Sequence, residues 1–337
     1  MNVRHILSTL AGEVRQYKLP AVLTPVFVVL EVLMEVLIPF VIADLIDKGV
    51  EMGNYAVVAE DGVILIILAL LALLFGIIAG KTSADASAGF AKNLRRAVFT
   101  NVQKFSFANI DKYSPPSLIT RMTTDITNIQ NSFMMMIRVA IRSPVMFLAS
   151  FIIVVIIKPE MALIFAAVVP ILGIGVGFLT VKTFPIFERV FKKYDSLNAV
   201  VRENIRGIRV VKSFVRESFE KKKFNTASAD IYTEFVTAEK LMALMSPLMQ
   251  FCVYLCIILI SLVGGQMIVF GDFTKGELIS VISYTMQILM SFMMVAMVIV
   301  MITMARASAI RITEVLDEVP TVTNPENPVT EVADGSV

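Results

Sequence analysis

Residues 63–80 form the run VILIILALLALLFGIIAG, which contains no charged side chain. A helix needs about 20 predominantly apolar residues to cross the hydrocarbon core of a bilayer. Five other stretches are long and apolar enough, namely Leu19–Ile46, Val139–Ile157, Met161–Val181, Leu241–Phe270 and Leu278–Ala305. The chain is 57% hydrophobic and 17% charged, whereas soluble domains average about 45–50% and about 25%. The sequence therefore predicts an all-α membrane protein with six transmembrane helices.

The connections between these six stretches alternate in length and charge. Residues 81–138 and 182–240 form two long connections rich in Lys and Arg, whereas residues 47–62 hold four acidic side chains and Lys48 alone. Cationic connections stay on the cytoplasmic side of a membrane. We therefore expect a multi-pass membrane protein with both termini and both long connections in the cytoplasm.

The long connections do not have the composition of loops. Segments such as Ala91–Lys104 and Tyr194–Arg206 keep apolar residues at helical spacing and contain no Gly or Pro. We expect the transmembrane helices to continue far into the cytoplasm as two hairpins. The breaks at their tips are predicted near Ser114-Pro115-Pro116 and around Gly207.

Three motifs in these positions resemble one family. Residues 104–113, KFSFANIDKY, and 117–125, SLITRMTTD, resemble the first intracellular loop of ABC exporters. Residues 201–217, VRENIRGIRVVKSFVRE, resemble the second loop, and 305–317, ARASAIRITEVLD, the junction toward a nucleotide-binding domain. The similarity covers essentially residues 5–320. The chain is identified as the transmembrane domain of a bacterial ABC-type multidrug exporter of the type IV fold. Phe133–Pro144 and Ser280–Met304 look most like a subunit of the heterodimeric kind.

The resemblance implies an organisation and a set of partners. Residues 1–18 would be an amphipathic elbow helix, 19–319 the six-helix domain, and 320–337 a linker toward an ATPase domain. It also implies a domain-swapped dimer with a second, identical or different, transmembrane subunit. Coupling helices within Phe105–Tyr113 and Ile205–Phe214 would contact nucleotide-binding domains. The coupling residues would be Phe105, Phe107, Asn109, Asp111, Gly207, Arg209, Lys212 and Phe214.

In the elbow segment, one helical face is expected to hold Ile6, Leu7, Leu10 and Val14. Arg15 and Lys18 would then meet lipid phosphates at the cytoplasmic surface.

No ATPase site is found in the sequence itself. The phosphate-binding string Gly-x4-Gly-Lys-Ser/Thr does not occur, and neither a catalytic nor a metal site can be assembled around the single histidine, His5. ATP and Mg would bind the associated nucleotide-binding domain, encoded beyond Val337 or on another chain. Glu331–Val337 resembles the entry to the first strand of such a domain. The chain is expected to be either a fragment or a separate permease.

Methionines and two intramembrane acids are the candidate substrate residues. We expect the cavity to be lined by Glu31, Glu35, Met135, Met286, Met290, Phe292, Met293, Met294, Met297 and Met301. Methionine side chains are flexible and accept many shapes, although these could instead face lipid or a neighbouring helix. Ionisable groups inside a span usually face the bundle interior. Glu35 would therefore attract cations or pair with a basic group, while a neutral interhelical hydrogen bond is the structural alternative. Arg138 and Arg142 could face the inner mouth of the cavity, but we expect them to reach lipid phosphates.

These features indicate the permease half of an ATP-driven exporter of amphipathic small molecules that works by alternating access. A lipid or peptide exporter is an alternative within the family. An ion-gradient transporter or channel is an alternative from another class. The substrate, and the choice between a homodimer and a heterodimer, stay open.

Overall fold

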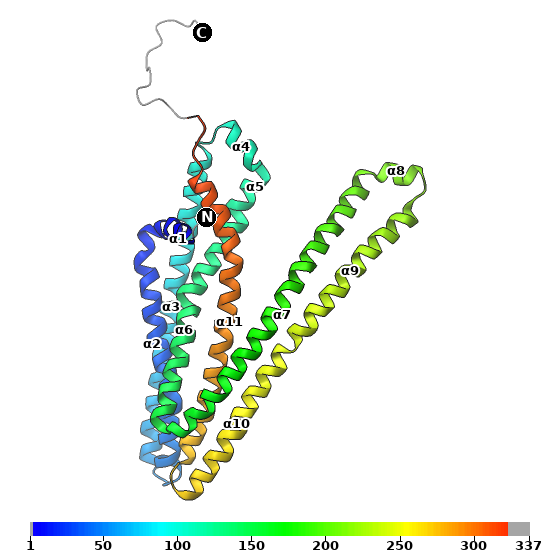
Figure 1. Cartoon of the computed structure of the whole chain (residues 1–337). Coiled ribbons are helices and arrows are strands. Elements are labelled where there is room, and N and C mark those ends of the chain that lie inside the picture. The colour runs from blue at the N-terminus through cyan, green and yellow to red at the C-terminus, as the bar shows by residue number, and fades with distance from the viewer. Residues whose placement is uncertain (1–2, 323–337) are drawn as a thin grey trace, which may run out of the picture. The chain divides into compact units, whose positions relative to one another are not determined.

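The computed structural model describes residues 3–322, and every regular element in that range is helical (Figure 1). In chain order the elements are α1 Val3–Gly12, η1 Arg15–Tyr17, α2 Lys18–Asp44, η2 Leu45–Val50, α3 Tyr55–Val102, α4 Phe107–Tyr113, α5 Pro115–Thr120, η3 Arg121–Asp125, α6 Ile126–Ile157, α7 Pro159–Arg206, α8 Ile208–Ser213, α9 Glu217–Ala243, α10 Met245–Phe270 and α11 Lys275–Asp317. Six helical segments are long and apolar enough to cross a membrane. The predicted all-α fold with six spans is confirmed.

Short sequence signals fix where the long helices start and stop. Asn54 caps α3, because its side-chain oxygen accepts the amides of Ala56 and Val57. Pro159 begins α7, at a position where the missing amide proton costs nothing. Gly271 ends α10 with a φ of 81°, a left-handed conformation that glycine adopts without strain. The turns between spans are therefore short and locally specified.

The predicted cytoplasmic extensions are also helical. Helices α3 and α7 each contain 48 residues, which corresponds to about 72 Å at 1.5 Å per residue. The hydrocarbon core is only about 30 Å thick. More than half of each helix must therefore lie outside it.

Two compact units divide the chain. The first contains Met1–Ile153 and Lys275–Val337, and the second contains Val154–Thr274. In the first unit, α2 packs along both α3 and α11. In the second, α7 packs along α9 and α10, and the short helix α8 joins α7 to α9 at the tip of their hairpin (Figure 1).

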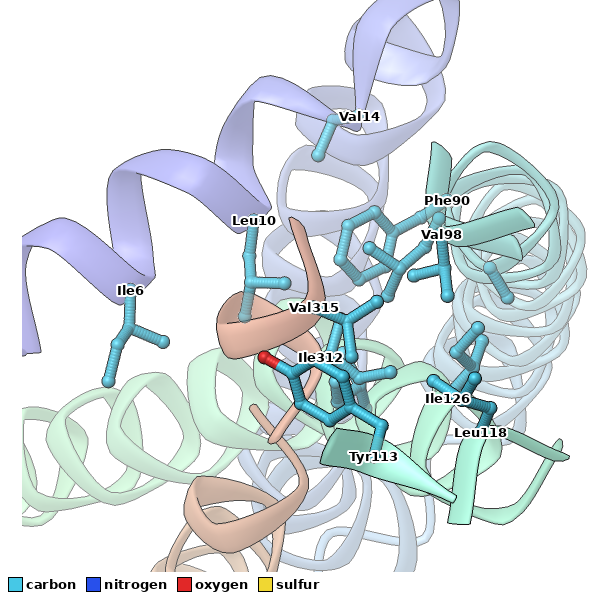
Figure 2. Close-up of a cluster of buried hydrophobic side chains, with 13 residues drawn as sticks. Ile6, Leu10, Val14, Phe90, Val98, Tyr113, Leu118, Ile126, Ile312 and Val315 are labelled. Carbon is cyan, nitrogen blue, oxygen red and sulfur yellow. The ribbon is translucent and has the colours of Figure 1, made fainter. Parts of the chain in front are cut away.

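A hydrophobic cluster in the first unit joins both ends of the described chain. Ile6 and Leu10 of α1 pack with Phe90 of α3 and with Ile312 and Val315 of α11, as Figure 2 shows. The apolar face of α1 therefore lies against protein.

The same packing corrects part of the elbow prediction. Leu7 does not share the buried face, because its side chain is 57% exposed. The Arg15 guanidinium forms an ion pair with Glu13, an interaction that the sequence did not suggest.

Candidate functional site

An ion cluster connects the first and third spans. One nitrogen of Arg142 on α6, Nη1, lies 2.7 Å from Oε1 of Glu31 on α2. The other, Nη2, lies 2.8 and 2.6 Å from the two carboxylate oxygens of Glu35. One guanidinium therefore holds both acids, which are one helical turn apart. The prediction that Arg142 reaches lipid phosphates is wrong, because both of its terminal nitrogens bind the α2 carboxylates.

Gly76 of α3 lies against Glu31, the more deeply buried of the two acids. Glu31 is 9% exposed, and its Oε2 has no hydrogen-bond partner among the described residues. A Cβ on Gly76 would lie 3.1 Å from Glu31 Oε1, so a larger residue would press on the carboxylate. A buried charged oxygen without a partner is unfavourable. Glycine at position 76 therefore leaves the space that the Glu31 carboxyl group occupies.

A small pocket with a volume of about 250 Å³ lies beside the ion cluster. Its lining comes from α6 and α11 and consists of Arg142, Ser143, Met146, Met286, Gln287, Met290, Ser291 and Met294. It therefore combines flexible apolar walls with one charged group.

The predicted methionines divide into two groups. Met286, Met290 and Met294 line this pocket with Arg142. Met293 and Met297 are exposed on α11 but do not line it, and Met135, Phe292 and Met301 are half-buried. The structure thus brings three of the predicted methionines to the ion cluster.

Polar side chains also fix one wall of the pocket. The Ser150 hydroxyl donates to Gln287 Oε1 at 2.9 Å. The Ser291 hydroxyl donates to the backbone oxygen of Ile288 within its own helix. These bonds hold α11 side chains in place while the methionines stay adaptable.

The tip of the first hairpin binds residues 318–321, the segment that follows α11. Asn109 of α4 donates from Nδ2 to Glu318 Oε1 at 3.0 Å and to the Val319 oxygen at 3.2 Å. Its Oδ1 accepts the Thr321 amide at 3.1 Å and the Ser106 amide at 3.2 Å. Asn109 was predicted to contact an ATPase domain, but it is buried against residues 318–321 of its own chain.

Charged and aromatic side chains complete this contact. Lys112 Nζ lies 2.7 Å from Glu318 Oε2, and the Tyr113 hydroxyl donates to the same oxygen at 2.8 Å. Burial, together with the bond to Glu318, raises the pKa of Tyr113 to about 12. The bonds from Lys112 and Tyr113 lower the pKa of Glu318. We call Asn109, Lys112, Tyr113 and Glu318 the junction clasp.

Helices α1 and α3 hold the same end of α11. The Asn101 side-chain amide donates to the backbone oxygens of Val315 and Glu318, at 2.7 and 3.1 Å. His5 Nε2 lies 2.7 Å from Asp317 Oδ2. Carbonyls at a helix C-terminus lack partners within the helix, so Asn101 satisfies part of that need. Sequence reasoning missed Asn101 and Glu318, since neither stands out from other surface polar residues.

Two of the recognised motifs also meet each other. Asp125 of the first loop motif binds Arg311 of the junction motif through Arg311 Nε at 2.8 Å. Ser308 donates to Asp125 Oδ1 at 2.8 Å, and Arg121 contacts Glu314 at 3.2 Å. The motifs were recognised separately, and their pairing was not predicted.

The remaining coupling candidates lie at the surface of the hairpin tips. Phe107 is 89% exposed and Asp111 is exposed on α4, whereas Phe105 stacks on Tyr113. In the second hairpin, Arg209 and Phe214 are exposed. Lys212 is exposed too, but it pairs with Glu217 of its own hairpin at 3.1 Å.

Gly207 separates α7 from α8, as predicted. A Cβ at this position would lie 3.3 Å from the Glu203 oxygen, so glycine suits the break. The remainder of the predicted linker, residues 323–337, lies outside the described residues.

Six apolar helices, four of them in one unit with an ion cluster and pocket between them, define a multi-pass membrane protein. The family model described as the ABC transporter transmembrane region matches residues 22–308, so the chain belongs to this family.

Curated relatives agree with that assignment. The chain is 28% identical over 303 residues to YfiB of Bacillus subtilis, an uncharacterized ABC transporter ATP-binding protein, covering 90% of this chain and 53% of the relative. It is 29% identical over 323 residues to an uncharacterized ABC transporter ATP-binding protein of Mycobacterium tuberculosis, covering 96% and 56%. A fatty acid ABC transporter ATP-binding/permease protein of Mycobacterium bovis is 28% identical over 225 residues, covering 67% and 36%. The chain thus spans about half the length of the first two.

Proposed function

We propose that this chain is the membrane-spanning half of an ATP-driven exporter of amphipathic small molecules that works by alternating access. The observation that carries the proposal is the pair of hairpin tips. Each long helical hairpin has an exposed aromatic side chain at its tip, Phe107 at the start of α4 and Phe214 directly after α8. Exposed aromatic side chains are suited to anchor in clefts on a partner. An ion-gradient transporter would have no evident use for them.

The partner would be a nucleotide-binding domain, in cis or in trans, that carries ATP and Mg. Positive residues in both hairpins support a cytoplasmic location for the tips and the termini. Closure of two such domains would move α4 and α8, and the junction clasp would pass the movement of α4 to α11.

A domain-swapped dimer is part of the proposal. Spans four and five, with their hairpin, form a compact unit of their own. A pair of spans with its own packing is able to associate with a second transmembrane subunit. The coupling tip α8 would then reach the partner's nucleotide-binding domain.

A lipid exporter is the second candidate. One relative is named as a fatty acid transporter, and an acyl chain would suit the apolar walls of the pocket. A lipid substrate should stimulate ATP hydrolysis where drug-like dyes do not.

The test is purification of the chain from its native membrane in mild detergent. We expect an ATP-binding domain either on the same polypeptide, with a mass far above 37.2 kDa, or on a co-purifying subunit. Substituting Phe214 with Ala should weaken recovery of a separate subunit, while Ser213→Ala serves as the matched control. A native chain that contains no ATP-binding domain and recovers none would refute the proposal.

A further inference from the structure

We propose that Asp61 binds a proton from the outer solution and that the protonated side chain keeps η2 in contact with α3 and α11. Residues 47–62 connect the first two spans. The cytoplasmic location proposed for both hairpin tips puts this connection on the opposite side of the membrane. The inference therefore rests on the proposed function for its orientation, and it adds regulation of the transport cycle by external acidity.

Asp61 is a buried carboxyl group whose charge has no direct partner. It lies near the start of α3 and is only 7% exposed. Its Oδ2 atom has no hydrogen-bond partner among the described residues. A buried carboxylate without a partner is unfavourable, whereas the neutral acid has no charge to compensate. The surroundings of Asp61 therefore favour the protonated form.

The charged neighbours of Asp61 act in the same direction. They are Asp44 of α2, Lys48 of η2 and Glu60 of α3 itself. The cation among them is already paired, because Lys48 Nζ lies 2.6 Å from Asp44 Oδ1. A second carboxylate beside this pair is repelled by Asp44 and competes for Lys48. Protonation of Asp61 removes the repulsion and leaves the pair intact.

The short element η2 lies directly against this part of α3. It spans Leu45–Val50 and is π-helical, a rare form that often lies at functional sites. A Cβ on Gly49 would lie 2.7 Å from Val58 Cγ2, so the two backbones approach closely. Val58 precedes Asp61 by three residues on the same helix. A change in the charge of Asp61 therefore acts on the contact between η2 and α3.

The same element and the residue after it bind the start of α11. Asp47 Oδ1 accepts the Gly276 amide at 2.8 Å, and Lys275 Nζ lies 2.5 Å from Glu51 Oε1. A Cβ on Gly276 would overlap the backbone oxygen of Ala43, so α11 also touches the end of α2 here. We call Asp47, Glu51, Lys275 and Gly276 the outer latch. Release of substrate to the outside requires the outer end to open, so the strength of this latch affects the cycle.

Acidity should favour the closed latch. When Asp61 is ionised, repulsion by Asp44 and the gain of hydration on exposure favour movement of η2 away from α3. Asp47 then loses the Gly276 amide. The closed state binds the proton more tightly than the open state does, so the latch is strongest at low pH and weakens as the pH rises. One such group changes the opening equilibrium by at most about tenfold per pH unit.

Hydrogen exchange of the native assembly in lipid nanodiscs measures the latch. The reporter is the Gly276 amide, which donates to Asp47 Oδ1. Its exchange is expressed as a protection factor, which removes the intrinsic effect of pH on exchange, and is compared at about pH 5.5 and about pH 7.5. In native protein we expect protection to be about three- to tenfold higher at the lower pH.

Asp61→Asn should show high protection at both pH values, because its amide cannot ionise. Glu60→Gln is the matched control, since it removes a negative charge from the adjacent, exposed position and should retain most of the pH dependence.

Native protection that does not change with pH would overturn the inference, even if no variant folds. An Asp61→Asn protein with the native pH dependence would also overturn it, and so would loss of that dependence in Glu60→Gln. A native assembly without an ATP-binding domain would refute the proposed function instead, and it would leave the pH dependence of the latch in place.

Discussion

Substituting Asn109 with Ala should release the segment after α11 from the first hairpin. Asn109 is 2% exposed and bonds to two backbone groups of that segment, the Val319 oxygen and the Thr321 amide. A hydrogen bond contributes about 1 kcal/mol net, so these two bonds together account for about 2 kcal/mol. This energy corresponds to a roughly 30-fold increase in the equilibrium constant for opening.

Hydrogen exchange of the native assembly measures this opening directly. The Thr321 amide donates to Asn109 Oδ1, so its exchange rate should rise by roughly 10- to 30-fold in the variant. Asp111→Ala is the matched control, because Asp111 is exposed on the same short helix. Substrate-stimulated transport should fall more than basal ATP hydrolysis. If the Thr321 amide of a folded Asn109→Ala protein exchanges at the same rate as in native protein, the reasoning is refuted.

Three other predictions concern charge and the second hairpin. Because the pKa of Tyr113 is raised in the folded chain, its contribution to stability should be complete below about pH 10 and be lost as the pH rises toward 12. In native protein, hydrogen exchange at the junction clasp should become faster over this pH range. The same pH-dependent increase in the Tyr113→Phe variant would show that Tyr113 is not its cause. Asp125→Asn should lower the free energy of unfolding by about 2–3 kcal/mol. The loss is smaller than for a fully buried ion pair, because the Arg311 side chain is 44% exposed. An unchanged thermal unfolding midpoint would contradict this prediction. Phe214→Ala should reduce substrate-stimulated ATP hydrolysis several-fold without altering thermal stability. If the variant is stimulated as strongly as native protein, Phe214 is not part of the coupling surface.

The spans and hairpins could be predicted because they depend on local patterns. Apolar runs, charge asymmetry and breaks at residues such as Gly207 are visible along the chain, and the structure places helix ends at or near them. The prediction of one shared apolar face in the first helix is confirmed for Ile6 and Leu10 and wrong for Leu7, because the partners of the buried face lie on α3 and α11.

The polar contacts could not be predicted in the same way. Asn101 and Glu318 are more than 200 positions apart, and no periodic pattern connects them. Arg142 was expected to reach lipid phosphates, since its sequence position near a span end is typical of that role. Its actual partners, Glu31 and Glu35, lie on α2, and Glu35 is 107 positions away in the chain, so no local pattern connects them.

The most direct test of the central claim is transport by the native assembly in sealed proteoliposomes. Inside-out vesicles are supplied from outside with ATP and Mg or with a non-hydrolysable ATP analogue. Accumulation of the fluorescent amphiphile trimethylammonium-diphenylhexatriene is followed with and without an ionophore that removes ion gradients. We predict accumulation that requires ATP hydrolysis and persists with the ionophore present. Accumulation that is driven by an imposed ion gradient without ATP would contradict the claim.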